Sequence, residues 1–355
     1  MASPLRSEVF HGIGSVDPGV WERVSAGHPY SGRAWCQYGE AVLGCPGYYV
    51  ILSCGSEPLG GALFSVLRQE QIPIRSPLIR GALERYLERH PLLACRTAPS
   101  TNFSGLFLPR DPTLRQSALD AVRAAALDIA HDCRASFVLF DYLGGPEMAL
   151  GWGRFTPLAD FLDIGTRLDN QWGSFESYQE HIKAAGLSRR KWLKRHLKEA
   201  LASGIEVRFG VRPDVDMAVR LHQNVERQYG EVLFPHTRPI MEHARELSDA
   251  VWMTAYHDGR LVSTELLLHD SANHVCTPTL YGRDYEAENV YFYTYYEVVR
   301  YAVEQLRVTA IIGNSGAYDF KHHLGFEPDP RNNMVFASAS PVMQRAGRWL
   351  ARLAG

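Results

Sequence analysis

The order of hydrophobic patterns in the second half of this chain constrains its fold more than any other feature. Alternating apolar residues mark strands, and apolar residues spaced three and four apart mark helices. Asp258-Gly259 is a pair typical of a two-residue hairpin turn and joins two of the strands. The predicted elements are, in order, a strand at 205–209, helices at 213–230 and 238–247, strands at 251–256, 261–269 and 274–281, a helix at 290–306, a strand at 308–312, a short helix and a last strand. This order predicts a mixed α/β domain.

The first half repeats the order of elements without repeating the sequence. Strands are expected at 48–54, 59–67, 102–108 and 136–142, with an Ala/Leu-rich helix at 113–132. A length of 355 residues fits two domains. We therefore expect a duplicated fold whose first copy has diverged.

Composition excludes several classes of protein. The chain is 46% hydrophobic and 21% charged, as in ordinary globular proteins, and its net charge of −2 argues against a surface covered in positive charge. The six cysteines form no C-x-x-C pair and indicate free thiols in a reducing compartment. The N-terminus lacks the apolar core of a signal peptide, and no apolar run is long enough to span a membrane. We expect a cytoplasmic protein.

A basic segment, SRRKWLKRHLKEALASG, lies between the two halves at residues 188–204. On a helical wheel, its cations form one stripe and its apolar residues Leu193, Leu197, Ala200 and Leu201 form the opposite one. Gly204 is a fitting helix stop. The stripe is either a solvated helix face or a surface that binds phosphates of a nucleic acid. The candidate phosphate-binding residues are Arg190, Lys191, Lys194, Arg195 and Lys198.

The segment GNSGAYDFKHHLGF, residues 313–326, follows a strand and contains Lys321. Transfer of an acyl group to an amine requires a neutral amine and stabilisation of the developing oxyanion. A lysine at the end of the last strands could stabilise that oxyanion or bind a substrate phosphate; the alternative is a surface lysine. Asp319, two residues earlier, could accept a proton or cap the helix.

Other candidates are distributed over the second half. Glu265 lies among leucines in a strand, where a carboxylate needs a partner or a cleft. Arg283 could meet an anionic group or only solvent. Tyr281, Tyr285 and Tyr293 belong to a dense tyrosine cluster, of which half is expected in the core and the rest in a ligand groove. His322-His323 lacks a suitably spaced third ligand, so we expect no metal.

These segments together resemble the Fem-like branch of the GNAT superfamily, the tandem-GNAT aminoacyltransferases and their relatives. In this fold an Asn, an Ala and an aromatic residue precede Gly-Phe, and Asn314, Ala317, Phe320 and Gly325-Phe326 occupy those positions. We expect Asn314 to be a substrate-binding residue. The Phe-Lys pair of Fem enzymes lies in the active site and corresponds to Phe320 and Lys321. A strand glutamate is the base in many GNAT enzymes, which makes Glu265 the candidate here. The resemblance implies a charged tRNA as the aminoacyl donor.

One departure bears on the donor. CoA-dependent members have a glycine-rich turn before their third helix, which binds the pyrophosphate. The corresponding stretch here, RDYEAENVYF, has no glycine. We therefore expect tRNA-dependent amide formation on an amine-bearing small molecule or peptide, without a permanently bound cofactor. Acyl-CoA-dependent transfer is the second hypothesis, and a non-catalytic peptide- or glycan-binding module the third.

The expected domains are a diverged GNAT-like domain at 1–168, a basic helical connector at 169–204, and a GNAT-like domain at 205–355.

Overall fold

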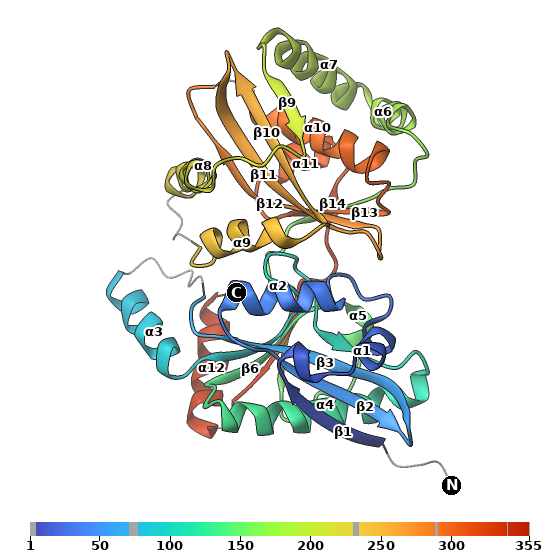
Figure 1. The fold of residues 1–355 in the computed structure, drawn as a ribbon, viewed down its shortest axis with the longest axis vertical. Helices are drawn as coiled ribbons and strands as arrows, with labels where there is room; N and C mark the ends of the chain where they lie inside the picture. The colour runs from blue at the N-terminus through green and yellow to red at the C-terminus, as the bar shows by residue number, and fades with distance from the viewer. Residues whose placement is uncertain (1–4, 71–76, 230–233, 288–289, 339, 355) are drawn as a thin grey trace. The chain divides into compact units, whose positions relative to one another are not determined.

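The computed structural model describes residues 5–70, 77–229, 234–287, 290–338 and 340–354. It divides into two compact units: unit 1 consists of Met1–Ile164 and Pro330–Gly355, and unit 2 consists of Gly165–Asp329. Each unit contains a mixed sheet flanked by helices (Figure 1). The predicted mixed α/β class and the tandem arrangement are confirmed.

Unit 2 follows the element order expected from the sequence. Its elements are β8 (Thr166–Asp169), α6 (Phe175–Ala184), α7 (Leu187–Ala202), β9 (Glu206–Phe209), α8 (Val215–Gln228), α9 (Thr237–His243), a 3-10 turn (Ala244–Glu246), β10 (Ala250–His257), β11 (Arg260–Asp270), β12 (Val275–Arg283), α10 (Val290–Glu304), β13 (Ala310–Asn314), α11 (Tyr318–His323) and β14 (Glu327–Pro328). The strands lie in the order β14-β8-β13-β12-β11-β10-β9.

Local sequence explains several of these boundaries. Asp258 and Gly259 have φ of 50° and 75°, which is the left-handed backbone that the β10–β11 hairpin turn requires. Asp214 accepts a hydrogen bond from the backbone N–H of Met217 (3.0 Å) and caps α8. Gly204 adopts φ of 68° directly after α7 and ends that helix as expected.

The core of unit 2 lies between the sheet and helices α6, α7 and α10. Val298, Val299 and Ala302 of α10 pack with Leu267 of β11 and Ile311 of β13. The other face of the sheet is covered by α8, whose backbone comes so close to β12 that a Cβ on Gly282 would lie 2.6 Å from the His222 nitrogen. The sheet is therefore buried on both faces.

Unit 1 repeats this architecture. Its elements are β1 (Leu5–His11), a 3-10 turn (Ile13–Ser15), α1 (Pro18–Ser25), α2 (Arg33–Leu43), β2 (Tyr48–Cys54), β3 (Glu57–Leu67), α3 (Pro77–Arg89), β4 (Leu92–Cys95), β5 (Leu106–Phe107), α4 (Pro112–Asp132), β6 (Phe137–Leu143), α5 (Gly145–Met148), β7 (Thr156–Leu158), β15 (Asn333–Ala337) and α12 (Pro341–Ala354). Its main strand order is β1-β2-β3-β4-β6-β15-β7, and β5 also pairs with β3.

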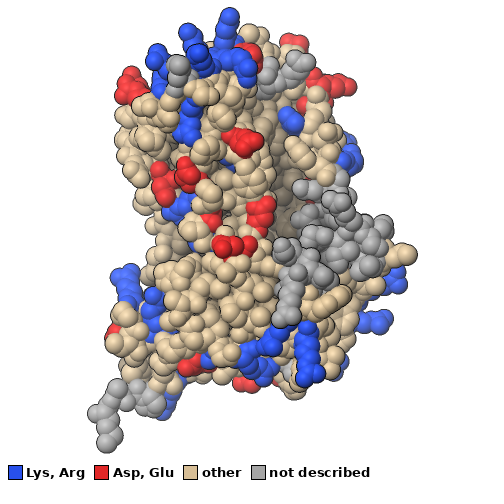
Figure 2. Space-filling model, turned by 180° about the vertical axis from the view of Figure 1, so that it is seen from behind, with Lys and Arg blue, Asp and Glu red and all other residues tan. Residues whose placement is uncertain are grey.

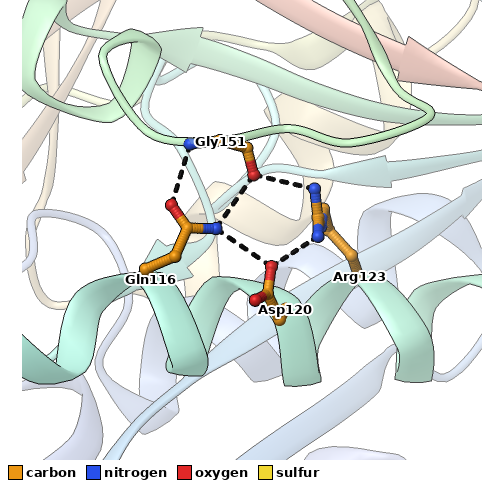
Figure 3. Close-up of polar contacts among 4 residues, drawn as sticks. All are labelled: Gln116, Asp120, Arg123 and Gly151. Carbon is orange, nitrogen blue, oxygen red and sulfur yellow. Dashed lines mark hydrogen bonds and ion pairs between the residues drawn. The ribbon is translucent and has the colours of Figure 1, made fainter.

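Helix α4 covers one face of the unit 1 sheet and also anchors a loop. Its apolar side packs on strands β2, β3 and β6, while its polar side contacts the turn at Gly151 (Figure 3). Gln116 binds both the N–H and the carbonyl of Gly151, at 2.8 and 2.9 Å. Arg123 donates to the same carbonyl (2.8 Å) and pairs with Asp120. The turn at Gly151 is thus fixed to a regular helix.

The expected domain boundaries differ from those in the structure. Most of strand β8 (Thr166–Asp169) falls in the expected N-terminal domain, and only its last residue, Asp169, falls in the expected connector. The strand nevertheless pairs with β13 and β14 of unit 2. Strand β15 lies in the expected C-terminal domain, but it pairs with β6 and β7 of unit 1. The expected connector is not separate either, because α6 and α7 contribute to the core of unit 2. Backbone pairing between distant segments decides these boundaries.

Two local expectations were also wrong. Leu201 is 71% exposed, although it was expected on the buried side of α7 with Leu193 and Ala200. The expected strand at 102–108 is reduced to Leu106–Phe107, and Asn102 at the start of the expected range adopts a left-handed backbone with φ of 59°. None of the described helices is both long and apolar enough to cross a membrane.

Candidate active site

Glu265 lies at an irregularity in the pairing of β11 with β12. Thr264 is opposite Gly282 and Leu266 is opposite Thr279, so two residues of β12, Leu280 and Tyr281, face Glu265. Leu280 has φ of 51°, as the extra residue of a bulge often does. Bulges redirect side chains and occur frequently beside active sites.

The carboxyl group of Glu265 is buried and incompletely bonded. The residue is 3% exposed, and its Oε2 has no hydrogen-bond partner among the described residues. Burial raises the pKa of Glu265 to about 8, and the nearby Lys321 ammonium opposes this rise. Glu265 can therefore exchange a proton near neutral pH, which is the property required of a general base.

Lys321 is buried in unit 2, contrary to the surface-lysine alternative. It is 3% exposed, and its ammonium donates to the backbone carbonyls of Gly313, Asn314 (3.0 Å) and Ser315 (3.2 Å). A lysine ammonium has three N–H donors, so these carbonyls account for all of them. The hydrogen bonds of the ammonium fix the end of β13, and its positive charge lowers the pKa of Glu265 through space.

Strands β12 and β13 diverge at this end. They pair in parallel only at Val275–Ala310 and Cys276–Ile311. Farther along, contact is maintained by the Asn314 side chain, whose Nδ2 donates to the carbonyl of Pro278 (2.6 Å). Ligands of α/β proteins bind outside the carboxyl ends of parallel strands. Glu265 and Lys321 therefore lie near the edge of the sheet where a substrate is expected.

Aromatic rings surround these two charges. The Tyr291 ring is 5.0 Å from Tyr281 and 4.8 Å from Phe320, and Tyr295 is 5.6 Å from Phe320. Lys321 Nζ is 5.9 Å from the Tyr295 ring. Burial raises the pKa of Tyr281, Tyr291 and Tyr295, and the neighbouring Glu265 raises all three further. These tyrosines are thus neutral at ordinary pH, and the hydroxyls of Tyr281 and Tyr295 have no hydrogen-bond partner among the described residues.

The remaining candidates from the sequence occupy different surroundings. Asp319 has an exposed side chain, while its backbone carbonyl hydrogen-bonds with Nδ1 of His323 (2.6 Å). Arg283 lies over the Tyr285 ring (4.0 Å) and near Tyr291 (5.8 Å). Tyr293 is separate from this group.

Tyr293 faces another side of α10. The pKa of Tyr293 is raised by burial and by Glu297, which pairs with Arg300 on the same helix.

The structure therefore brings together Glu265, Lys321, Phe320 and Tyr281. Histidine, cysteine and carboxylate side chains form no group of three suited to a metal within the described ranges.

The basic helix α7 packs against the elements of the site. Trp192 lies 5.8 Å from Phe320, 5.4 Å from Phe292 and 4.6 Å from His323, measured between ring centroids. The expected cationic side chains are exposed: Arg190, Lys191, Lys194, Arg195 and Lys198. Figure 2 shows Lys and Arg side chains gathered at the end of unit 2 where α7 lies. We call these five residues the α7 cationic face.

Sequence reasoning did not select Tyr291, Tyr295 or Trp192 as site residues. The i, i+4 spacing of Tyr291 and Tyr295 could have placed both on one face of α10. Trp192 carried no comparable signal, because its partner Phe320 lies more than 120 residues away in the sequence. Only the tertiary fold brings these two rings together.

Comparisons with known proteins agree with this geometry. Residues 188–322 match the family model of the acetyltransferase (GNAT) domain, so the match includes α7, Glu265 and Lys321. None of the curated proteins matches the sequence.

Several solved structures share the fold over nearly the whole chain. The crystal structure of FemX aligns with a TM-score of 0.60 at 12% identity, covering 97% of this chain and 100% of FemX. A tandem GNAT protein from the clavulanic acid biosynthesis pathway aligns with a TM-score of 0.50 at 14% identity, covering 95% and 99%. L-PGS from Bacillus licheniformis aligns with a TM-score of 0.51 at 12% identity, covering 96% and 97%. Residues 188–322 therefore match a GNAT-type acyltransferase domain, and the chain as a whole shares the tandem fold of these solved structures.

Proposed function

We propose that this acyltransferase forms an amide by transferring an aminoacyl group from aminoacyl-tRNA to an amine acceptor. The observation that carries the proposal is the α7 cationic face, which is exposed on the same helix whose inner side packs on α11 through Trp192. A surface for a polyanion therefore adjoins the elements that hold Glu265 and Lys321. The folds of FemX and L-PGS are consistent with this assignment.

Glu265 is the general base of the proposed reaction. Its ionised carboxylate accepts a proton from the acceptor ammonium, and the neutral amine then attacks the ester carbonyl of the donor. The C–N bond forms and the ester C–O bond breaks. As the ester bond breaks, the nitrogen gives up a second proton and the ribose oxygen takes up one. Neither the new amide nor the ribose hydroxyl then carries a charge.

Lys321 has an electrostatic and positioning role in this proposal. Its three N–H donors are engaged by the carbonyls of residues 313–315, so it provides positive charge without a free hydrogen-bond donor. Asn314 positions β13 against Pro278, and Phe320 packs between the tyrosines and Trp192. Tyr281, Arg283 and Tyr285 are proposed to contact the substrate.

The donor is tested with two parallel reactions. The protein is incubated with a pool of amines and either aminoacyl-tRNA or acyl-CoA, with and without ribonuclease, and products are followed by mass spectrometry. We expect product with aminoacyl-tRNA and its loss after ribonuclease treatment. Product that survives ribonuclease would exclude tRNA as the donor.

The α7 cationic face is tested by reversing its charge. Lys191→Glu, Lys194→Glu and Lys198→Glu together should weaken tRNA binding by at least ~10-fold and reduce its salt dependence, because phosphate contacts release counterions. The matched control reverses three other exposed cations of unit 2, Lys183, Arg212 and Arg220. Equal loss in both triple variants would indicate a general charge effect and contradict a specific surface.

Acyl-CoA-dependent transfer is the second candidate. It is favoured by the match of residues 188–322 to an acetyltransferase domain and by the divergence of β12 from β13. The stretch before α10 argues against it, since Asp284 and Glu286 would repel a pyrophosphate and no glycine occurs there. Ribonuclease-resistant product made from acyl-CoA would establish this alternative.

A further inference from the structure

An open cavity of about 480 Å³ lies beside the site, and Tyr285, which is proposed above to contact the substrate, is part of its lining. Its lining comes from the last turn of α8 and from the segment after β12. The lining residues are Asn224, Arg227, Gln228, Asp284, Tyr285 and Glu286. A volume of this size is sufficient for a small molecule.

The two walls of the cavity are held together by hydrogen bonds between α8 and β12. His222 Nδ1 lies 2.8 Å from the carbonyl of Tyr281, to which it donates, and Asn224 Nδ2 donates to the carbonyl of Arg283 at 3.3 Å. Gly282 permits this close approach, because any side chain there would meet the backbone of α8. The cavity is therefore shaped by regular secondary structure on both sides.

A continuous series of contacts leads from the cavity to the buried charges. Arg283 stacks on Tyr285 of the lining at 4.0 Å and lies 5.8 Å from the Tyr291 ring. Tyr291 in turn contacts Tyr281 and Phe320, which surround Glu265 and Lys321. These packed side chains connect one wall of the cavity to the residues around Glu265.

The charges of the lining have opposite signs on the two walls. Arg227, on α8, is exposed and makes hydrogen bonds only to neutral side chains of its own helix among the described residues. The opposite wall carries Asp284 and Glu286; Arg260 pairs with Asp284 at 2.9 Å and approaches Glu286 at 3.7 Å. Glu286 is 82% exposed, so this longer contact is screened and its carboxylate stays accessible.

We infer that this cavity binds the amine acceptor through a zwitterionic head group, the ammonium and carboxylate of an α-amino acid or of a peptide-like molecule. The carboxylate pairs with Arg227 and the ammonium with Glu286, while a second amine extends toward Glu265. This inference rests on the proposed amide-forming function and adds the chemical class of the acceptor. Arg227 and Glu286 are then specificity-determining residues rather than catalytic ones.

Three related probes test this inference without any donor. L-Lysine carries both head-group charges and a distant amine, cadaverine lacks the carboxylate, and 6-aminohexanoate lacks the α-ammonium. In ¹H–¹⁵N NMR titrations, we expect L-lysine to bind about 3-fold more tightly than either matched probe, since each exposed charged contact contributes modestly to affinity. The shifted amides should include residues 224–228 and 284–286.

Variants assign each charge to its wall. Arg227→Ala should remove the preference for L-lysine over cadaverine, and Glu286→Gln should remove the preference over 6-aminohexanoate. The controls Arg220→Ala and Glu304→Gln alter exposed residues of α8 and α10 outside the cavity and should preserve both preferences.

Two results would overturn the inference: equal affinity for all three probes, or shifts confined to other parts of the protein. Because binding is measured without a donor, the result is independent of the donor experiment. Binding of L-lysine without amide formation would contradict the proposed function alone, whereas transfer to amines that do not perturb the cavity would contradict this inference alone.

Discussion

At the scale of single residues, the reaction proposed above relies on one buried carboxyl group and one buried ammonium. Burial raises the pKa of Glu265 to about 8, and Lys321 prevents a larger rise. The acidic limb of the pH profile of kcat/KM is therefore expected near pH 8 if Glu265 is the base.

The first prediction concerns Lys321→Met, which retains the volume of the side chain and removes its charge. Without the ammonium, the pKa of Glu265 should rise further, so the acidic limb should move to higher pH. Each unit of this shift lowers the rate at pH 7 by about 10-fold, because less of the base is ionised. The measurement is kcat/KM across pH 6–10, with ¹³C NMR of the Glu265 carboxyl group as a second readout.

The control for this variant is Lys198→Met, which removes an exposed cation from α7. An unchanged Glu265 titration in Lys321→Met would refute the electrostatic coupling, even if activity fell because the fold was weakened.

The second prediction links Glu265 to stability. Its pKa in the folded protein, about 8, exceeds the ordinary value of 4.5, so the folded state holds this proton more tightly than the unfolded state. The stabilisation is complete below pH 4.5 and is lost as the pH rises toward 8. Glu265→Gln should therefore gain stability relative to the wild type by a few kcal/mol, roughly, between pH 5 and pH 9. Urea unfolding at both pH values measures this difference, and a pH-independent difference would contradict it.

At the scale of elements, α7 joins a surface to the site. Its outer side carries the α7 cationic face, and its inner side places Trp192 against Phe292 of α10 and Phe320 of α11. The amphipathic pattern of the sequence predicted both sides of the helix but not the partners of the inner one.

The third prediction concerns this contact. Trp192→Ala removes the ring that joins α7 to α10 and α11, and we expect a loss of about 3 kcal/mol in unfolding free energy, as for other large-to-small core changes. Hydrogen exchange should accelerate in α7 and α11. The exposed Trp349 of α12 provides the control, since Trp349→Ala should change stability by less than ~0.5 kcal/mol. Similar losses in both variants would contradict the assigned role.

At the scale of the whole molecule, each unit is completed by a strand from outside its main run of sequence. Strand β8 precedes the GNAT-like order of unit 2 and pairs with its β13. Strand β15 follows unit 2 and returns to pair with β6 of unit 1. The chain thus leaves unit 1, forms the whole of unit 2, and comes back.

The fourth prediction compares two fragments. Residues 165–329 contain all strands of the unit 2 sheet and should unfold cooperatively when expressed alone. Residues 205–355, the domain expected from the sequence, lack β8, α6 and α7 and carry the unpaired β15, so this fragment should aggregate or remain unfolded. Circular dichroism and thermal melts of both fragments test this. A cooperative melt of 205–355 would refute our account of the boundaries.

The sequence by itself determined the local elements of unit 2, because hydrophobic period, capping residues and the Asp258-Gly259 turn act over a few residues. It also located Glu265, Phe320 and Lys321 as candidates and predicted exposed cations on α7. Only the tertiary structure decided that Lys321 is buried against three carbonyls, that Tyr291 and Tyr295 surround Glu265, and that β8 and β15 belong to the opposite units from those expected. These outcomes depend on contacts between residues far apart in the chain, and local patterns contain no information about which distant backbone completes a sheet or closes around a charge.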